Sequence, residues 1–204
     1  VTWVIDDWRL TSDAAISNDF GSPMDMGMAG RIGNTVTVNG RVPEKIEVRA
    51  GERIRLRLIN TANARFFGLE FSGHRPRVIA YDGQPVEPHE LSGGRIVLGP
   101  AMRADIVIDM TGAPKQSFEV VDQFYPSQTY RLLNIVYRDE SPLRDRPPAS
   151  PIALPANTMP EPDIERARRH DIAFGGGMMG GGMMGGGMMG RGMMGRGMMG
   201  GMMD

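Results

Sequence analysis

"RIRLRLIN", residues 53–60, alternates cationic and apolar side chains over its first six positions. The apolar set is Ile54, Leu56 and Leu58, and the cationic set is Arg53, Arg55 and Arg57. Successive side chains of a β-strand point to opposite faces, so a period of two indicates a strand with one buried face. We therefore predict a strand here, with the apolar set facing a core and the arginines facing outward.

Similar short segments flank this stretch, spaced at about 8–12 residues and separated by Gly or Pro, which is typical of a sandwich or barrel. Asn39-Gly40 and Asp82-Gly83 are favoured turn pairs between strands. The expected strands lie within residues 35–40, 77–83, 93–99, 103–110, 117–124 and 130–138. No apolar stripe of helical period and convincing length is present, so we predict an all-β fold, a Greek-key antiparallel β-sandwich over residues 1–139.

Composition excludes several kinds of site. The chain has no Cys and three His, namely His74, His89 and His170. Disulfides, thiolate catalysis and Cys-based metal sites are thereby excluded, including a blue-copper site, which needs one Cys and two His.

The net charge of −1 argues against nucleic-acid binding, and no apolar run of the length of a membrane span occurs. The chain opens inside an expected strand, "VTWVIDDWRL", with no initiator Met or signal peptide, and we expect it to be part of something longer.

A Pro-rich segment follows the expected sandwich. Residues 140–162 contain seven prolines and are incompatible with a helix or a central strand. We predict that residues 140–174 form an extended linker, with Asp163 capping one or two helical turns and "HDIAF", residues 170–174, forming a short strand of a next domain.

Residues 175–204 contain 15 Gly and 12 Met. Ordering so many backbones, half of them glycine, costs more free energy than burying twelve methionines returns, so we expect this tail to be disordered. Its thioethers are soft ligands that prefer Cu(I), and glycine lets several sulfurs reach one ion. The candidate Cu(I) ligands are Met178, Met179, Met183, Met184, Met188, Met189, Met193, Met194, Met198, Met199, Met202 and Met203. The alternatives are an adaptable apolar contact surface and a repeat without a chemical role.

A second methionine cluster lies in "SPMDMGMAGR", residues 22–31. Met24, Met26 and Met28 occupy every second position, so on a strand their sulfurs would share one face and add a weaker candidate Cu(I) site. The competing interpretation is a loop whose methionines pack on the domain beneath it.

Residues 35–112 carry a specific family resemblance. The motifs "GERIRLRLIN", "IAYDGQPVEP" and "LGPAMRADIVID" resemble, in order and spacing, the second cupredoxin domain of bacterial three-domain multicopper oxidases. "WVIDDWRL", residues 3–10, is similar to the first strand of that domain, so the resemblance covers residues 1–138. "RHDIAFGGGMMGG", residues 169–181, looks like the start of the third domain, where some members carry a Met-rich insertion that feeds Cu(I) to the enzyme.

The resemblance implies a periplasmic oxidase that uses copper to oxidise Cu(I), other metal ions or phenols while reducing O2 to water. It also implies that the copper ligands lie in the first and third domains, in His-x-His and His-Cys-His motifs that this chain lacks. His74 matches a position that is not a ligand, and we expect it to pack or form hydrogen bonds. His89 and His170 are expected to be solvated, and no catalytic or cofactor-binding residue is assigned.

We therefore expect a non-ligating central domain whose partners are the missing first and third domains and copper ions, with no oxidase activity alone and no contact with nucleic acid or membrane. The alternatives are a stand-alone periplasmic copper-binding protein without enzymatic activity, and a purely structural sandwich.

The arginines of residues 53–57 are expected on a solvated or inter-domain face, paired with acids such as Glu47 or Glu52. Asp105 and Asp109 are interpreted as carboxylates of a strand surface, so no pair suited to general acid catalysis is identified.

Overall fold

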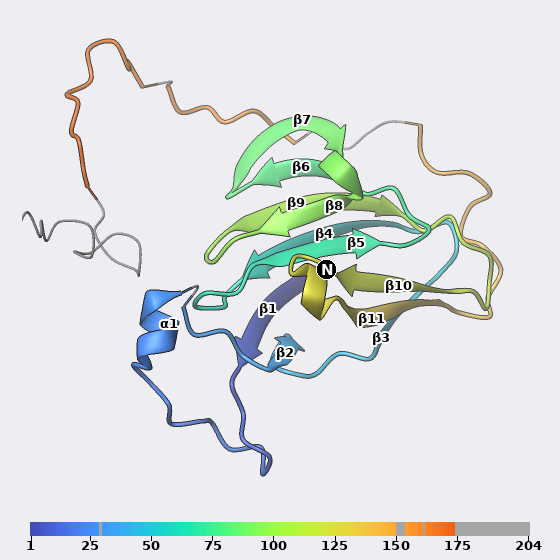
Figure 1. The fold of residues 1–204 in the computed structure, drawn as a ribbon. Coiled ribbons are helices and arrows are strands. Elements are labelled where there is room, and N and C mark those ends of the chain that lie inside the picture. Colours follow the sequence, from blue (N-terminus) through green and yellow to red (C-terminus); the bar gives the residue numbers. More distant parts are fainter. Residues whose placement is uncertain (29, 150–153, 161, 174–204) are drawn as a thin grey trace, which may run out of the picture. The chain divides into compact units, whose positions relative to one another are not determined.

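The computed structural model describes residues 1–28, 30–149, 154–160 and 162–173. Eleven strands form two sheets in this part of the chain (Figure 1): a six-stranded sheet in the order β2-β1-β4-β9-β6-β7 and a five-stranded sheet in the order β3-β11-β10-β5-β8. The strands are β1 (Thr2–Trp8), β2 (Thr35–Val38), β3 (Lys45–Val48), β4 (Arg53–Asn60), β5 (Phe67–Phe71), β6 (Arg77–Tyr81), β7 (Gln84–Glu90), β8 (Arg95–Leu98), β9 (Arg103–Asp109), β10 (Ser117–Asp122) and β11 (Tyr130–Tyr137). One short helix, α1 (Pro23–Gly27), and two 3₁₀ turns, η1 (Ser92–Gly94) and η2 (Pro126–Gln128), complete the described elements.

The all-β sandwich predicted from the sequence is confirmed, with one correction to its strand directions. β1 pairs with β4, and β3 with β11, in parallel, so both sheets are mixed rather than antiparallel. Parallel neighbours need a long crossover connection, and each of these pairs is separated by other strands along the chain. A turn signal at the end of one strand cannot predict a parallel pairing with a distant strand.

The outward face of β4 carries a ladder of cross-strand ion pairs with β9. Arg53 Nε and Nη2 donate to the two carboxylate oxygens of Asp109 at 2.7 and 2.8 Å, and Arg55 Nε donates to Asp105 at 2.9 Å. Arg57 lies 3.6 Å from the same Asp105 carboxylate. The predicted pairing with Glu47 or Glu52 is therefore wrong, because the register places Asp109 opposite Arg53 and Asp105 opposite Arg57.

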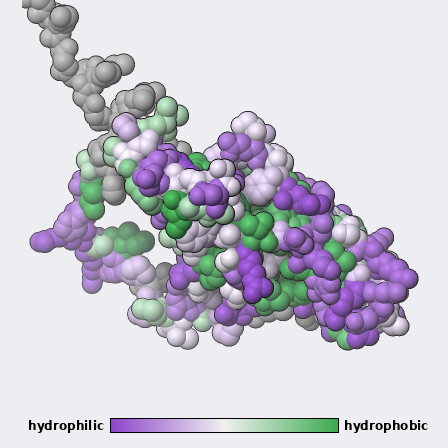
Figure 2. All heavy atoms as spheres, turned by 90° about the horizontal axis from the view of Figure 1, so that it is seen from below, coloured by the Kyte–Doolittle hydropathy of each residue, from purple (hydrophilic) through white to green (hydrophobic). Residues whose placement is uncertain are grey.

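Hydrophilic side chains cover much of the surface. Figure 2 shows one face of the molecule, on which hydrophilic side chains surround smaller hydrophobic patches. The ion pairs of the ladder are partly buried, with the Arg53 and Asp109 side chains 14% and 27% exposed, and their positions fix the register of β4 against β9.

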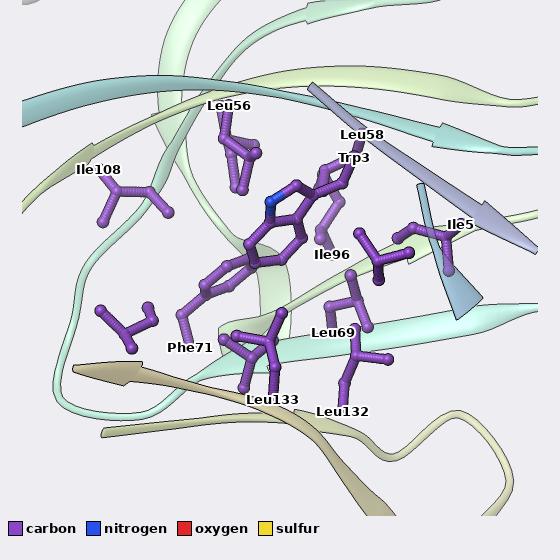
Figure 3. Packing of buried hydrophobic residues seen from close by; sticks show 14 of the residues in the cluster. Trp3, Ile5, Leu56, Leu58, Leu69, Phe71, Ile96, Ile108, Leu132 and Leu133 are labelled. Atoms are coloured by element: carbon purple, nitrogen blue, oxygen red, sulfur yellow. The ribbon is translucent and has the colours of Figure 1, made fainter. Parts of the chain in front are cut away.

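The inward face of β4 enters the core, as the alternation predicts. Leu56 and Leu58 are 2% and 0% exposed, and Ile54 is partly buried against the same cluster. Figure 3 shows Leu56 and Leu58 near Trp3, with Phe71 and Leu133 of the other sheet below them. Since both sheets supply this cluster, its burial holds the two layers together.

The first part of the predicted linker lies against the sandwich. Leu143 N donates to Ala50 O at 2.7 Å, and Arg53 Nη2 donates to Pro148 O at 2.9 Å. Further along, Asp163 accepts a hydrogen bond from Arg166 N in an isolated turn, and residues 170–173 form no strand. The predicted helical turns are thus a single turn, and the methionine tail lies outside the described residues.

Gly51 allows the linker segment around Arg144 to lie close against the sandwich. Its φ is 78°, and an added Cβ would lie 2.5 Å from Arg144 O and 2.7 Å from Arg144 N. We expect Gly51→Ala to lower the free energy of unfolding by about 2–4 kcal/mol, as left-handed strain and a backbone clash act together. Gly83→Ala is the matched control, since Gly83 has φ 87° but nothing within 4 Å of its added Cβ. Urea unfolding of the two variants separates the backbone strain, which both share, from the clash with Arg144, which only Gly51→Ala introduces. Equal losses of unfolding free energy in the two variants would show that the contact with Arg144 is unimportant.

Candidate functional site

Both ring nitrogens of His74 are engaged. Nδ1 lies 2.8 Å from Ser72 O, and Nε2 lies 2.7 Å from the Tyr137 hydroxyl. A carbonyl oxygen can only accept, so Nδ1 carries the proton and the neutral ring accepts from Tyr137 through Nε2. The ring also meets the edge of Phe118 at a centroid distance of 5.0 Å. His74 therefore packs and forms hydrogen bonds, as expected.

The other two histidines are exposed. His89 lies on β7, and its Nδ1 is 2.9 Å from Glu87 O; His170 lies beyond the sandwich. In the described parts of the chain no group of three His, Asp or Glu side chains is placed to hold a metal ion. Together with the absence of Cys from the sequence, this donor set does not fit the copper centres of an oxidase.

The early methionine cluster is helical, which corrects both interpretations of it. Met24, Met26 and Met28 are 66%, 67% and 68% exposed, so they neither share a strand face nor pack on the domain. Met24 and Met26 lie on α1, and Met28 caps its C-terminal end with its N–H bonded to Met24 O. Pro23 at the start of α1 favours this local structure.

Ion pairs hold the segment around α1. Arg9 donates to Asp25 at 2.8 and 2.9 Å and to Asp19 at 2.7 Å, and Arg31 also pairs with Asp19. A hydrogen bond from Ser17, followed by those from Arg31 and Arg9, lowers the pKa of the Asp19 carboxyl. The segment is thus ordered by charge while its methionine side chains face solvent.

One buried polar cluster was not predicted from the sequence. Asp122 Oδ1 accepts hydrogen bonds from Gly68 N at 2.9 Å and Phe124 N at 3.1 Å, and the Arg65 guanidinium lies 3.8 Å from Oδ2. Burial raises the pKa of the neighbouring Tyr130 hydroxyl. The sequence signal was Arg65 within the largely apolar stretch "ANARFFGLEF", residues 62–71, and a charge in such a stretch does not identify its partner.

No described helix is long and apolar enough to cross a membrane.

The fold and the donor set define a cupredoxin-like β-sandwich that does not supply a copper centre from its described residues. The family model "Multicopper oxidase" matches residues 1–137, and the chain belongs to this family.

Among curated proteins, the chain is 31% identical to the cell division protein FtsP of Shigella dysenteriae over 115 residues, 55% of this chain and 24% of that protein. It is 34% identical to the multicopper oxidase mco of Staphylococcus aureus over 120 residues, 58% of this chain and 26% of that protein. A solved multi-copper oxidase from Pseudomonas thermotolerans superposes with a TM-score of 0.70 and 29% identity, covering 82% of this chain and 38% of that one. The chain thus spans about a quarter of the length of these curated relatives.

The buried histidine predicts a pH effect. Burial lowers the pKa of the His74 imidazole below its ordinary value of 6.5, and the hydrogen bond to Ser72 O opposes this only in part. The unfolded state therefore binds a proton first as the pH falls, so the contribution of His74 to stability is complete above about pH 6.5 and is lost below it.

We expect the stability difference between the unmodified chain and His74→Gln to shrink when the pH falls from about 8 to about 5, as measured by urea unfolding. His89→Gln, a substitution at an exposed histidine of β7, is measured beside it as the reference. A difference for His74→Gln that stays flat over this range would contradict the inferred protonation state.

Proposed function

We propose that this chain is the central, non-ligating domain of a multicopper oxidase, and that its Met-rich segment, residues 175–204, binds Cu(I) and delivers it to the enzyme. The observation that carries the first part is the engagement of His74, whose two ring nitrogens are both used in hydrogen bonds inside a sandwich of this family. In this role the sandwich positions neighbouring domains and takes no part in the electron transfer.

The partners of the chain are then the first and third cupredoxin domains, which would bear the copper ligands. The domain limits proposed from the sequence are a sandwich over residues 1–139, a connecting segment over residues 140–174 and the methionine segment. Hydrogen bonds from Leu143 and to Pro148 support a connection that begins flush against the sandwich.

The copper role of the methionine segment rests on ligand chemistry. Its side-chain donors are nearly all thioethers, which suit Cu(I) and are poor ligands for harder ions. The exposed Met24, Met26 and Met28, on α1 and at its C-terminal end, form a weaker second candidate. We place this activity in the periplasm, on the basis of the resemblance to bacterial multicopper oxidases.

A second candidate is a binding protein without enzymatic activity. The observation that favours it is the similarity to proteins named for cell division, FtsP, together with the unsuitable donor set of the sandwich. In that case the methionine segment would bind copper for storage rather than delivery.

The first proposal makes a direct prediction about activity. The chain supplied with copper should not oxidise Cu(I) or a phenol with O2 faster than free copper, and it should lack the intense blue absorption of thiolate-bound Cu(II), since no thiolate is available. Mixing it with separately produced first and third domains should restore turnover if it is a central domain. Turnover by the chain alone would contradict the proposal, and failure of the mixture would favour the binding protein.

A further inference from the structure

An apolar cavity of about 190 Å³ lies between the two sheets. β1, β4 and β9 of the six-stranded sheet form one wall, and β3, β5 and β11 of the five-stranded sheet form the other. Its most buried lining residues are Trp3, Val48, Leu56, Phe71, Ile108, Met110 and Ile135, none more than 3% exposed. The cavity therefore reaches into the core from an exposed end at Val1 and Glu47.

The wall offers almost no polarity. The one charged side chain that lines it, Glu47, is exposed and bound by Lys45 at 2.7 Å. That charge is thus satisfied outside the cavity. An apolar cavity of about 150 Å³ is large enough to bind benzene.

Trp3 supplies a single polar group to this wall. The residue is 2% exposed, yet its indole N–H donates no hydrogen bond to any described residue. Figure 3 shows the indole nitrogen on the side of the ring facing Leu56 and Ile108, both of which line the cavity. This nitrogen is not sealed from solvent-sized space, so the cavity presents a donor that no acceptor in the described part of the chain occupies.

We propose that this cavity binds a neutral, mostly apolar molecule of about benzene's size that carries one hydrogen-bond acceptor. The ring or chain of the ligand fills the apolar volume, and its acceptor meets the Trp3 indole N–H. A ligand with a charge is excluded by the desolvation it would suffer. A ligand that carries a hydroxyl donor would find only the Met110 sulfur, which already lies 3.7 Å from the Tyr137 hydroxyl.

The test uses two compounds of the same shape, cyclohexanone, which has a carbonyl acceptor, and methylenecyclohexane, which has none. The chain contains two Trp, so its ¹⁵N-correlated NMR spectrum has two indole N–H signals, and Trp8→Phe assigns them. Neither compound is aromatic, so ring currents do not disturb the shifts. Cyclohexanone should move the Trp3 signal downfield saturably, and should leave the exposed Trp8 unchanged. Methylenecyclohexane should shift the methyl signals of the walls without the downfield movement of the indole.

Filling the cavity provides the control. Val48→Phe places a ring in the wall and should abolish saturable binding of both compounds, and Ile46→Phe at the partly buried rim does the same if Val48→Phe does not fold. Val97→Phe makes the same change at a position 38% exposed outside the cavity and should bind as the unmodified chain does. Absence of any saturable shift overturns the site, and binding of cyclohexanone without the indole shift overturns the role of Trp3.

Discussion

Leu56→Asp should abolish folding or lower the free energy of unfolding by about 4 kcal/mol or more, the range reached when an unpaired charge enters a core. Leu56 is 2% exposed in the middle of β4, which lies between β1 and β9. No cationic side chain shares its face, because the arginines of β4 point outward to β9 carboxylates. Ile54→Asp should be milder, since Ile54 is only partly buried and its carboxylate would reach solvent.

Urea unfolding followed by circular dichroism measures these losses, with Val97→Asp as the control. Val97 lies on β8 with 38% of its surface exposed, so the same substitution type should cost within about 1 kcal/mol there. If Leu56→Asp were as mild as Val97→Asp, the register of β4 would be wrong by one residue, since such a slip exchanges the two faces.

The strand pattern was predictable because it depends on near neighbours in the sequence. The period of two in residues 53–58 assigns both faces of β4 correctly. The turn pairs were equally informative: Asn39 and Gly40, like Asp82 and Gly83, all have positive φ, as a tight hairpin turn requires.

Features that depend on distant residues were not predictable. The acids that pair with Arg53 and Arg55 follow from the register of β4 with β9, 50 or more residues away. The parallel pairings of β1 with β4 and of β3 with β11 likewise join residues that are far apart in the sequence. For Met24, Met26 and Met28, a spacing of two suggested a strand, whereas Pro23 and the ion pair between Arg9 and Asp25 favour a helical turn.

For the candidate site, the inventory of donor side chains was predictable from the sequence, but their geometry was not. The lack of Cys and the scarcity of His excluded a copper centre without any structure. The bonds that occupy His74 involve Tyr137, 63 residues away, and the indole of Trp3 beside an apolar cavity has no local signal at all.

The largest binding effect is expected from the methionine segment. Cu(I) should bind through about two to four thioethers drawn from neighbouring Met pairs, and Zn(II) should bind the same segment poorly, because thioether is nearly its only side-chain donor. Affinity should change little between about pH 5 and pH 8, since a thioether has no proton to lose on binding. A loss of affinity at the acidic end would instead indicate histidine ligands.

A Cu(I) competition titration tests directly whether the methionines of residues 175–204 bind Cu(I). It compares the full chain with a variant in which the twelve methionines of residues 175–204 are replaced by Leu, which keeps their volume but removes the sulfur. The matched control replaces only Met24, Met26 and Met28. We expect the twelve-fold variant, like a chain ending at Phe174, to lose most of the bound Cu(I), whereas the control retains it. Equal affinity and stoichiometry in the full chain and the twelve-fold variant would contradict Cu(I) binding by these methionines. The segment would then be a spacer whose methionines have no role in copper binding.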